Sequence, residues 1–293
     1  MRYRRSTVRG VLVILAVALI TGPAAASPND QSVRKPIVFP VIGPYRYTND
    51  FGDPRPQGGG HQGNDILAPK KSPVVAVEDG KIKFWTTSAR AGCMLYLYGA
   101  SGTTYLYIHL NNDVTMANDN RGKCVAGGSY WPGLKDGAKV VAGQAIAFVG
   151  ESGDADGTPH LHFEVHPHDG GATNPFPYLN TATRILFTAP PGSAVTLSLK
   201  GAIVAADETH LTMKVATATV FPSGLKLLGL RKPMLLTLTP TALVGPPGSA
   251  AVNIAALVGK PAIILTLPAK TTLDTQAAND GAFSAARVVL GAA

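Results

Sequence analysis

The chain has 293 residues and a formal net charge of +8, with 26 lysines and arginines against 18 acidic residues. Four of the arginines (Arg2, Arg4, Arg5 and Arg9) lie at its start, so the remainder holds 22 basic residues and sits near +4. This modest charge predicts a weak attraction to an anionic envelope. It excludes a nucleic-acid-binding protein, because basic clusters with interleaved aromatic residues are absent from the sequence.

Residues 1–26 are typical of a secretory signal peptide. After the basic start comes an apolar stretch from Val11 to Thr21, and Ala24-Ala25-Ala26 then offers a cleavage site after Ala26. The apolar stretch is shorter than the roughly 20 residues of a membrane span, so an uncleaved anchor is the less favoured alternative. We therefore predict a secreted, periplasmic or cell-envelope protein with no stable membrane insertion after cleavage.

Residues 27–188 are predicted to form a mainly β domain. From about residue 37 to 180, short alternating runs are separated by glycine and proline, which indicates antiparallel strands. No convincing amphipathic helix interrupts them.

The run His61-Gln-Gly-Asn-Asp65 offers an imidazole and a carboxylate close together, after three consecutive glycines. Such groups suit zinc, which in catalytic sites takes three protein ligands and leaves a fourth position for water. The glycines and Pro69 disfavour a helix, so we expect a loop that runs into a strand. Taken alone, a polar turn between strands is an equally good interpretation.

A second histidine lies in the alternating run Thr104-Tyr-Leu-Tyr-Ile-His-Leu110. In a strand, alternate side chains share a face, so Tyr105, Tyr107 and His109 are expected on one side and the aliphatic residues on the other. His109 is then a candidate for work beside a metal. By itself it would more often be a strand-end histidine without a role.

Two more histidines lie one residue apart in Thr158-Pro-His-Leu-His-Phe-Glu-Val165. Strand alternation puts His160, His162 and Glu164 on one face and the apolar residues between them in a core. Two imidazoles on one face indicate a metal site, although an isolated pair would more often simply face water. The next two histidines, His166 and His168, are expected to be exposed beside the turn at Pro167.

Together these runs resemble the zinc metallopeptidases of the LytM and lysostaphin type, peptidase family M23, whose signature is His-x-x-x-Asp followed far downstream by His-x-His. The resemblance covers roughly residues 40 to 180 and implies an antiparallel β-sheet domain. Further matching segments are Phe51-Gly52, Asp65 to Pro69, Pro73 to Gly80, Tyr107 to Leu110, Val141 to Gly150, Pro159 to Glu164 and Asn174-Pro175.

The resemblance implies that His61, Asp65 and His162 bind one Zn2+ per chain, and that His109 and His160 are catalytic without touching the metal. The implied function is a zinc metalloendopeptidase, a hydrolase of peptide bonds in bacterial peptidoglycan (stem peptides or cross-links), acting through a zinc-activated water. Which of the two catalytic histidines is the general base is left open. Glu164 would either fix the tautomer of a ligand histidine or, as we rather expect, be a solvated strand carboxylate.

Cys93 and Cys124 are the two cysteines of the chain. An even count in an exported protein predicts one disulfide, and two thiols acting as zinc ligands are disfavoured because the histidine and aspartate set is already complete. The bridge would pin a long stretch, Asn111 to Gly137, which departs from the shorter connection common in the family. One hypothesis places this stretch beside the substrate groove, with Tyr130 and Trp131 in contact with substrate; the alternative, which we slightly prefer, is that these aromatic side chains pack on the domain itself.

Residues 189–293 are predicted to form a second, smaller β-rich domain of unknown role, which is a candidate for binding an envelope partner. Strands are expected at 195–199, 202–206 and 211–215, and a closing helix or strand at 282–289. A weak internal echo joins residues 232–239 to 260–267. It suggests a barrel or sandwich built from repeated hairpins.

Two other functions are open at this point. A catalytically silent M23-like protein that binds the wall or activates another cell-wall hydrolase would normally lack some ligands, whereas all five site positions are present here. A carrier-type β barrel is suggested by residues 140–149, which resemble strands of biotinyl and lipoyl modules. That interpretation lacks an attachment lysine and leaves four histidines unexplained.

Overall fold

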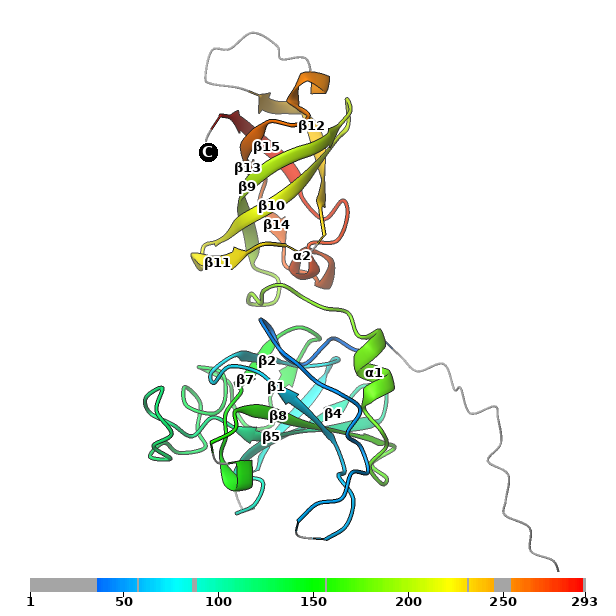
Figure 1. Ribbon diagram of the computed structural model, residues 1–293, viewed down its shortest axis with the longest axis vertical. Helices are drawn as coiled ribbons and strands as arrows, with labels where there is room; N and C mark the ends of the chain where they lie inside the picture. Colours follow the sequence, from blue (N-terminus) through cyan, green and yellow to red (C-terminus); the bar gives the residue numbers. More distant parts are fainter. Residues whose placement is uncertain are drawn as a thin grey trace, which may run out of the picture. The chain divides into compact units, whose positions relative to one another are not determined.

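The structure is a computed structural model that describes residues 36–291, apart from residues 57, 86–88, 156, 231 and 245–253 (Figure 1). The predicted signal peptide lies outside the described residues. Among the helices described, none is long and apolar enough to cross a membrane.

The first part of the chain is built on a six-stranded antiparallel sheet in the order β1-β8-β5-β4-β3-β6, which confirms the predicted antiparallel fold. A separate antiparallel pair joins β2 to β7. The elements of this part are β1 (Asn64–Leu67), β2 (Pro73–Val75), β3 (Gly80–Trp85), β4 (Cys93–Gly99), β5 (Thr103–Leu110), β6 (Lys139–Val140), β7 (Ala145–Phe148), the 3-10 turn η1 (Gly153–Ala155), β8 (His160–Pro167) and α1 (Phe176–Thr181).

One face of this sheet makes the hydrophobic core, and it follows the alternation seen in the sequence. Tyr107 of β5 lies opposite Phe163 of β8, their rings are 5.4 Å apart at a steep angle, and both are fully buried. Burying a side chain of this size contributes about 1.5–3 kcal/mol. The alternate residues of β8, His160, His162 and Glu164, are therefore left for the opposite face.

His109 corrects one sequence expectation, because it does not share a face with Tyr105 and Tyr107. Between the paired residues Cys93–Leu110 and Leu95–Tyr107, β4 has one residue and β5 has two, which is a β-bulge. His109 has a left-handed backbone (φ +61°). This conformation turns its side chain out of the alternation, and Leu110 takes the core position in its place.

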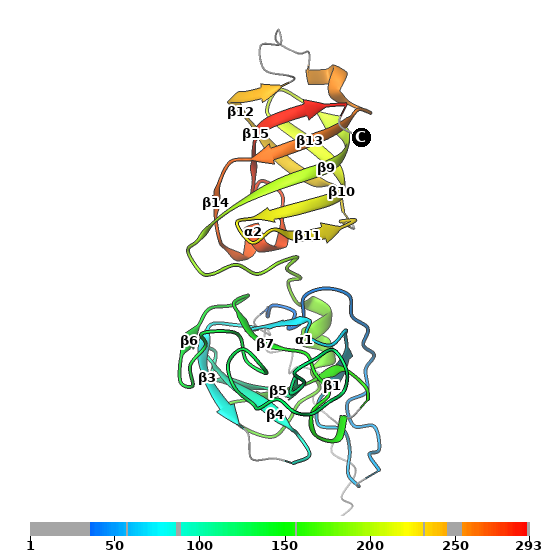
Figure 2. The same cartoon turned by 90° about the vertical axis from the view of Figure 1, so that its left-hand side faces the viewer.

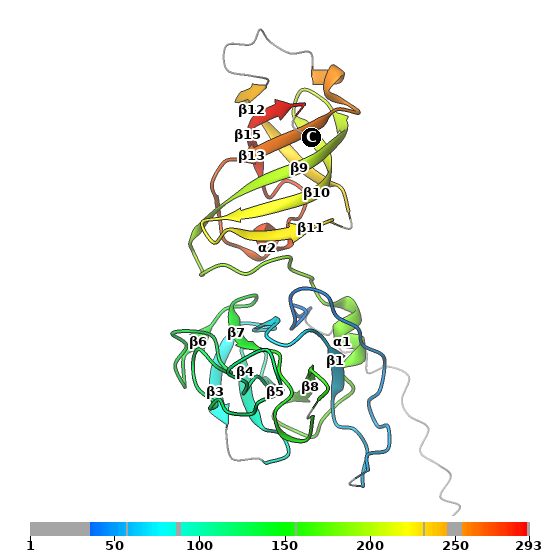
Figure 3. The same ribbon diagram turned by 60° about the vertical axis from the view of Figure 1, so that its left-hand side comes forward.

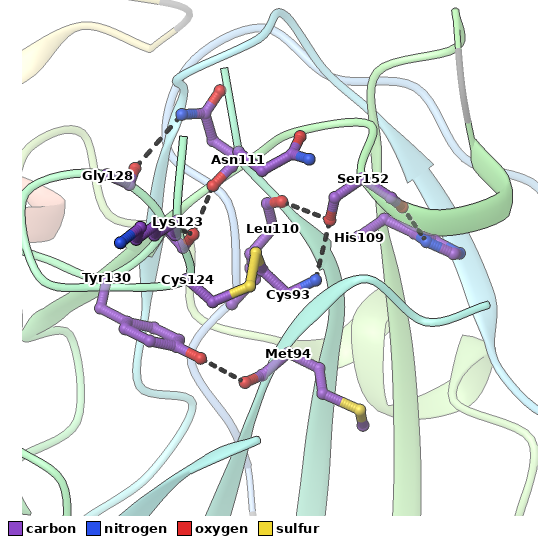
Figure 4. Close-up of a disulfide and its surroundings, with 12 residues drawn as sticks. Cys93, Met94, His109, Leu110, Asn111, Lys123, Cys124, Gly128, Tyr130 and Ser152 are labelled. Carbon is purple, nitrogen blue, oxygen red and sulfur yellow. Dashed lines mark hydrogen bonds between the residues drawn. A yellow bond between two sulfur atoms is a disulfide. The ribbon is translucent and has the colours of Figure 1, made fainter. Parts of the chain in front are cut away.

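No strand forms between Leu110 and Lys139 in the described structure, as expected for a long connection. The Cys93–Cys124 disulfide is confirmed and closes a sequence separation of 31 residues (Figure 4). A buried ion-pair group anchors the same segment: the Lys70 ammonium lies 2.8 Å from Asp113 and also contacts Glu151. The segment is thus tied down at its start and in its middle.

The aromatic residues of this segment pack on the domain itself, which was the preferred alternative. Tyr130 is fully buried and donates a hydrogen bond to the carbonyl of Met94, so the prediction that it contacts substrate is wrong. Trp131 stacks on Phe148, with ring centroids 4.9 Å apart. Packing on the domain itself, the alternative interpretation, describes both rings.

The second part of the chain is a closed β barrel (Figures 2 and 3). Its five wall strands pair in the order β9-β10-β12-β15-β13, and β13 pairs back onto β9. β12 and β15 run parallel, whereas the other wall pairs are antiparallel. The elements are β9 (Ala194–Ala206), β10 (His210–Phe221), β11 (Leu225–Leu228), β12 (Met234–Val244), η2 (Ile254–Leu257), β13 (Pro261–Thr266), β14 (Ala269–Lys270), α2 (Leu273–Ala277) and β15 (Ser284–Leu290).

Numbered along the chain, the barrel strands close in the order 1-2-3-5-4-1, which is the topology of the five-stranded OB-type barrel. The predicted β-rich class is confirmed. The two strands expected at 195–199 and 202–206 are one continuous strand, β9. The echoed segments form β12 and β13, which do not pair with each other, so the expected repeated hairpins are wrong. The predicted boundary between residues 188 and 189 falls before β9 and stays a prediction.

Candidate metal centre and active site

Strand register brings the candidate metal ligands together. Asp65 of β1 is the direct cross-strand partner of His162 of β8, and His61 arrives from the loop before β1, as expected. The three donor atoms form a nearly equilateral triangle: His61 Nε2 lies 2.9 Å from His162 Nδ1, and each of these nitrogens lies 3.1 Å from Asp65 Oδ1.

This triangle fits zinc. Zinc binds nitrogen and carboxylate oxygen at about 2.0–2.2 Å, so one ion could contact all three donor atoms, and catalytic zinc sites with three protein ligands leave a further position for water. Within the described residues, this is the one group of three or more histidine, cysteine or acidic side chains with donor atoms this close together. The donor set is that expected of a catalytic rather than a structural zinc site.

The far nitrogen of each ligand histidine is held by an acceptor. His61 Nδ1 donates to the carbonyl of Asp50 at 2.9 Å, and His162 Nε2 donates to Glu164 Oε1 at 2.9 Å. These bonds fix the tautomers and leave the lone pairs of His61 Nε2 and His162 Nδ1 for a metal.

Glu164 is therefore not the solvated carboxylate that we rather expected. It is buried, and its second oxygen binds His166 at 2.7 Å. Burial alone would raise the pKa of Glu164, but the hydrogen bonds from His162 and His166 lower it to about 2. His166 is accordingly half-buried on β8 rather than exposed, whereas His168 is exposed as expected.

Two charged residues of the loop before β1 complete the surroundings of the ligands. Arg55 binds Asp65 Oδ2 at 2.7 Å, which leaves Oδ1 for the metal. Burial would raise the pKa of Asp65, but its bonds to His162, His61 and Arg55 hold it well below its usual range. For His61, burial lowers the pKa, and the hydrogen bonds to Asp50 and Asp65 outweigh this and raise it to about 9.

His109 and His160 lie on the same side as the ligands, with ring centroids 4.9 Å apart. His109 Nδ1 donates to the Ser152 carbonyl at 2.8 Å, and His160 Nδ1 donates to the Thr158 carbonyl at 2.7 Å. Both rings are buried, and their Nε2 atoms remain available: His160 Nε2 is 3.6 Å from Asp65 Oδ1. All five site residues predicted from the sequence are thus brought together.

Burial, followed by the neighbouring His160, lowers the pKa of His109 to about 4. With Nδ1 holding the proton, the Nε2 of neutral His109 is a hydrogen-bond acceptor at neutral pH. The carboxylate of Asp154 lies 3.7 Å from it. His109 is therefore placed to accept a proton.

Ser152 links His109 to the disulfide (Figure 4). While its carbonyl holds His109, its hydroxyl accepts from the Cys93 amide at 3.0 Å and donates to the Leu110 carbonyl at 2.6 Å. An open cleft of about 690 Å3 lies here, lined by both cysteines and by Asn112, Lys123, Ser152 and Gly153 among others. The disulfide-closed segment thus borders the surroundings of His109.

Sequence reasoning missed Asp50, Arg55, Ser152 and Asp154. The two charged residues of the loop lie within eleven positions of His61, so their proximity was a usable signal. The acceptors of the other histidine hydrogen bonds are backbone carbonyls, which every residue has, so the sequence could not indicate them.

Residues 59–130 match the family model described as peptidase family M23. They include His61, Asp65 and His109. This part of the chain is similar to peptidase family M23. We call the first part of the described chain, from residue 36 to the end of α1, the M23 region. Among curated proteins, the chain is similar to the DD-carboxypeptidase/endopeptidases Mpg of Neisseria meningitidis and Neisseria gonorrhoeae, with 30% identity over 135 residues, which is 44% of this chain and 26% of theirs. The chain therefore spans about a quarter of the length of these relatives.

Two solved structures are also similar. The catalytic domain of the antimicrobial peptidase lysostaphin from Staphylococcus simulans is 28% identical, with 46% of this chain and 92% of that chain covered and a TM-score of 0.36. A zinc-containing peptidase from Vibrio cholerae is 24% identical, with 50% and 40% covered and a TM-score of 0.38.

Proposed function

We propose that this chain is an exported zinc metalloendopeptidase that hydrolyses peptide bonds of bacterial peptidoglycan. The observation that carries the proposal is the triangle of His61, Asp65 and His162 donor atoms with two further histidines beside it. The substrate class is supported by the curated relatives, whose name states a carboxypeptidase and endopeptidase activity. Secretion is supported by the sequence of the first 26 residues.

His61, Asp65 and His162 would hold the zinc ion. When bound, zinc supplies a Lewis acid that polarises the scissile carbonyl and lowers the pKa of a coordinated water. Arg55 and Glu164 keep the ligands aligned, because each occupies the ligand atom that faces away from the metal.

His109 is assigned as the general base. Its buried, neutral ring keeps Nδ1–H on Ser152 and offers Nε2 to the proton of the attacking water. The carboxylate of Asp154 would stabilise the imidazolium that results. The protonated His109 can then return this proton to the leaving amine.

His160 is assigned to the substrate oxygen. Its ring is oriented by the Thr158 carbonyl and stands between His109 and Asp65, so its Nε2 faces the position where negative charge develops. Since Nδ1–H is already bound to Thr158, donation from Nε2 requires the doubly protonated ring, the imidazolium. In that form His160 would donate a hydrogen bond to the oxygen and stabilise the tetrahedral intermediate, an effect worth about 3–4 kcal/mol when one such donor is removed from comparable sites.

The test uses the secreted form of the chain, purified with its zinc content measured by elemental mass spectrometry. Incubation with purified peptidoglycan should release peptide fragments, identified by mass, and a chelator should stop the release until zinc is restored. Asp65→Ala should lose both zinc and activity, whereas His109→Ala should keep zinc and lose activity. Full turnover by Asp65→Ala would overturn the proposal, and a zinc-loaded protein that binds walls without cutting them would favour the silent wall-binding alternative.

A further inference from the structure

The wall of the C-terminal barrel carries cations and no acidic residue. The segment 189–293 holds eight lysines and arginines and four acidic residues. All four acidic residues (Asp207, Glu208, Asp274 and Asp280) lie in turns or in α2, so strands β9 to β15 contain none. The outer surface of the described strands is therefore uniformly positive or neutral.

Strand register gathers three of the cations around one residue. Thr217 of β10 lies between Lys200 of β9 and Leu228 of β11 in one cross-strand row. On one side of this row, beyond the bulge at Ala216, Lys214 of β10 lies opposite Ala202 of β9. On the other side, Lys226 of β11 lies in the next row, opposite Thr219. We call Lys200, Lys214 and Lys226 the lysine cluster.

The cluster is accessible. All three lysines are exposed, and within the described residues none of them is in an ion pair. Strand and row spacings of about 4.8 and 7 Å place neighbouring lysine Cα atoms roughly 8–12 Å apart. The hydroxyls of Ser198, Thr217 and Thr219 lie between them as further hydrogen-bond donors.

The side chains present favour one kind of anion. Proteins that bind single-stranded nucleic acid stack the bases on aromatic side chains. In this barrel the aromatic residues are Phe221, which is partly exposed, and Phe283, which is buried. A surface of ammonium and hydroxyl groups without a stacking platform instead suits a flexible chain of repeated phosphate groups that has no aromatic part.

We propose that the lysine cluster on β9, β10 and β11 binds a linear polyol-phosphate polymer, an anionic chain of the kind found in bacterial envelopes. Through this contact the barrel would hold the protein at an anionic envelope surface. The binding does not depend on the peptidase activity. The proposed role of the barrel therefore rests on the charge of its wall and not on its OB-type topology alone.

The test measures binding of the full secreted chain, carrying His109→Ala, to soluble poly(glycerol phosphate). The triple variant K200Q/K214Q/K226Q should bind at least about tenfold more weakly. The slope of log K against log salt should fall by about two to three, roughly one for each lysine that neutralises a phosphate. Circular dichroism and a thermal scan should show that the exposed substitutions leave the fold intact.

A matched control removes the same charge elsewhere. K81Q/K135Q/K139Q changes three exposed lysines of the M23 region and should alter binding less than about threefold. Equal losses in both triple variants, or no loss in the first, would overturn the proposal. Tighter binding to single-stranded oligothymidine, or binding to phosphatidylglycerol vesicles and not to the polymer, would also overturn it. A failed peptidase assay leaves this result untouched, so the two proposals fail separately.

Discussion

Removing the Cys93–Cys124 disulfide should destabilise the M23 region by about 3–4 kcal/mol. The bridge closes a separation of 31 residues, and the chain-entropy model assigns about that free energy to a loop of this length. The double variant Cys93→Ala/Cys124→Ala should therefore unfold at markedly lower denaturant concentration than the wild type.

Both tryptophans, Trp85 and Trp131, lie in the M23 region, so intrinsic fluorescence in guanidinium chloride reports unfolding of that region and not of the barrel. Wild-type protein held reduced should match the double variant, and zinc content should be unchanged because neither cysteine is a ligand. A loss below about 1 kcal/mol with an unchanged denaturant slope would refute the reasoning. It would mean that the Lys70 ion pairs and the Tyr130 hydrogen bond already restrain the segment without the bridge.

Three further predictions concern the site and its support. Gly63→Ala should weaken zinc binding at least about tenfold, because a Cβ there would lie 2.6 Å from His162 Nε2. The control Gly171→Ala should leave zinc affinity unchanged, because a Cβ there meets nothing within 4 Å. Equal zinc affinities of the two variants in a chelator competition would contradict this prediction. Zinc affinity should rise at least about tenfold per pH unit from pH 7 to 9, because His61, whose pKa is raised to about 9, holds in the metal-free protein a proton that zinc must displace. Burial lowers the pKa of His162, but its bonds to Asp65 and Glu164 outweigh this and raise it as well, so its proton can make the rise steeper. A flat profile in calorimetry would count against this prediction. Lys70→Met should lower the free energy of unfolding by about 3–5 kcal/mol, because it leaves the carboxylates of Asp113 and Glu151 buried together without their cation. Lys71→Met should change the free energy of unfolding little, because Lys71 only donates to the Val114 carbonyl at the surface. Similar unfolding curves for the two variants would exclude this role of Lys70.

The sequence predicted which candidate residues lie together, because these residues follow strand alternation and short spacings. Alternation placed His160, His162 and Glu164 on one face, and the resemblance to the M23 family supplied their partners. The alternation rule failed at His109, because an extra residue in β5 shifts the alternation by one position. No residue type in the sequence indicates a bulge there. The hypothesis of a substrate contact was wrong for Tyr130, because its hydroxyl donates to a carbonyl 36 residues away and can therefore be buried.

The barrel was predicted only as a class. Individual strands were visible as Val, Leu and Thr runs, but closure depends on pairings such as β9 with β13, which joins Pro261 to Ala202 across the chain. Such long-range register is set by which side chains pack inside, and local patterns do not record it.

Because His109 lies in a β-bulge, the sheet can form without the residue that carries the proposed chemistry. Without that one residue, β5 would run Tyr107, Ile108, Leu110 in unbroken core-and-surface alternation, with every other pairing kept. A left-handed non-glycine residue costs about 1–3 kcal/mol, so a chain lacking His109 is expected to be the more stable one. The histidine that we propose as general base is thus an insertion into a scaffold that is complete without it. Deletion of this one residue should remove the proposed activity and leave a well-folded protein that can still bind its target.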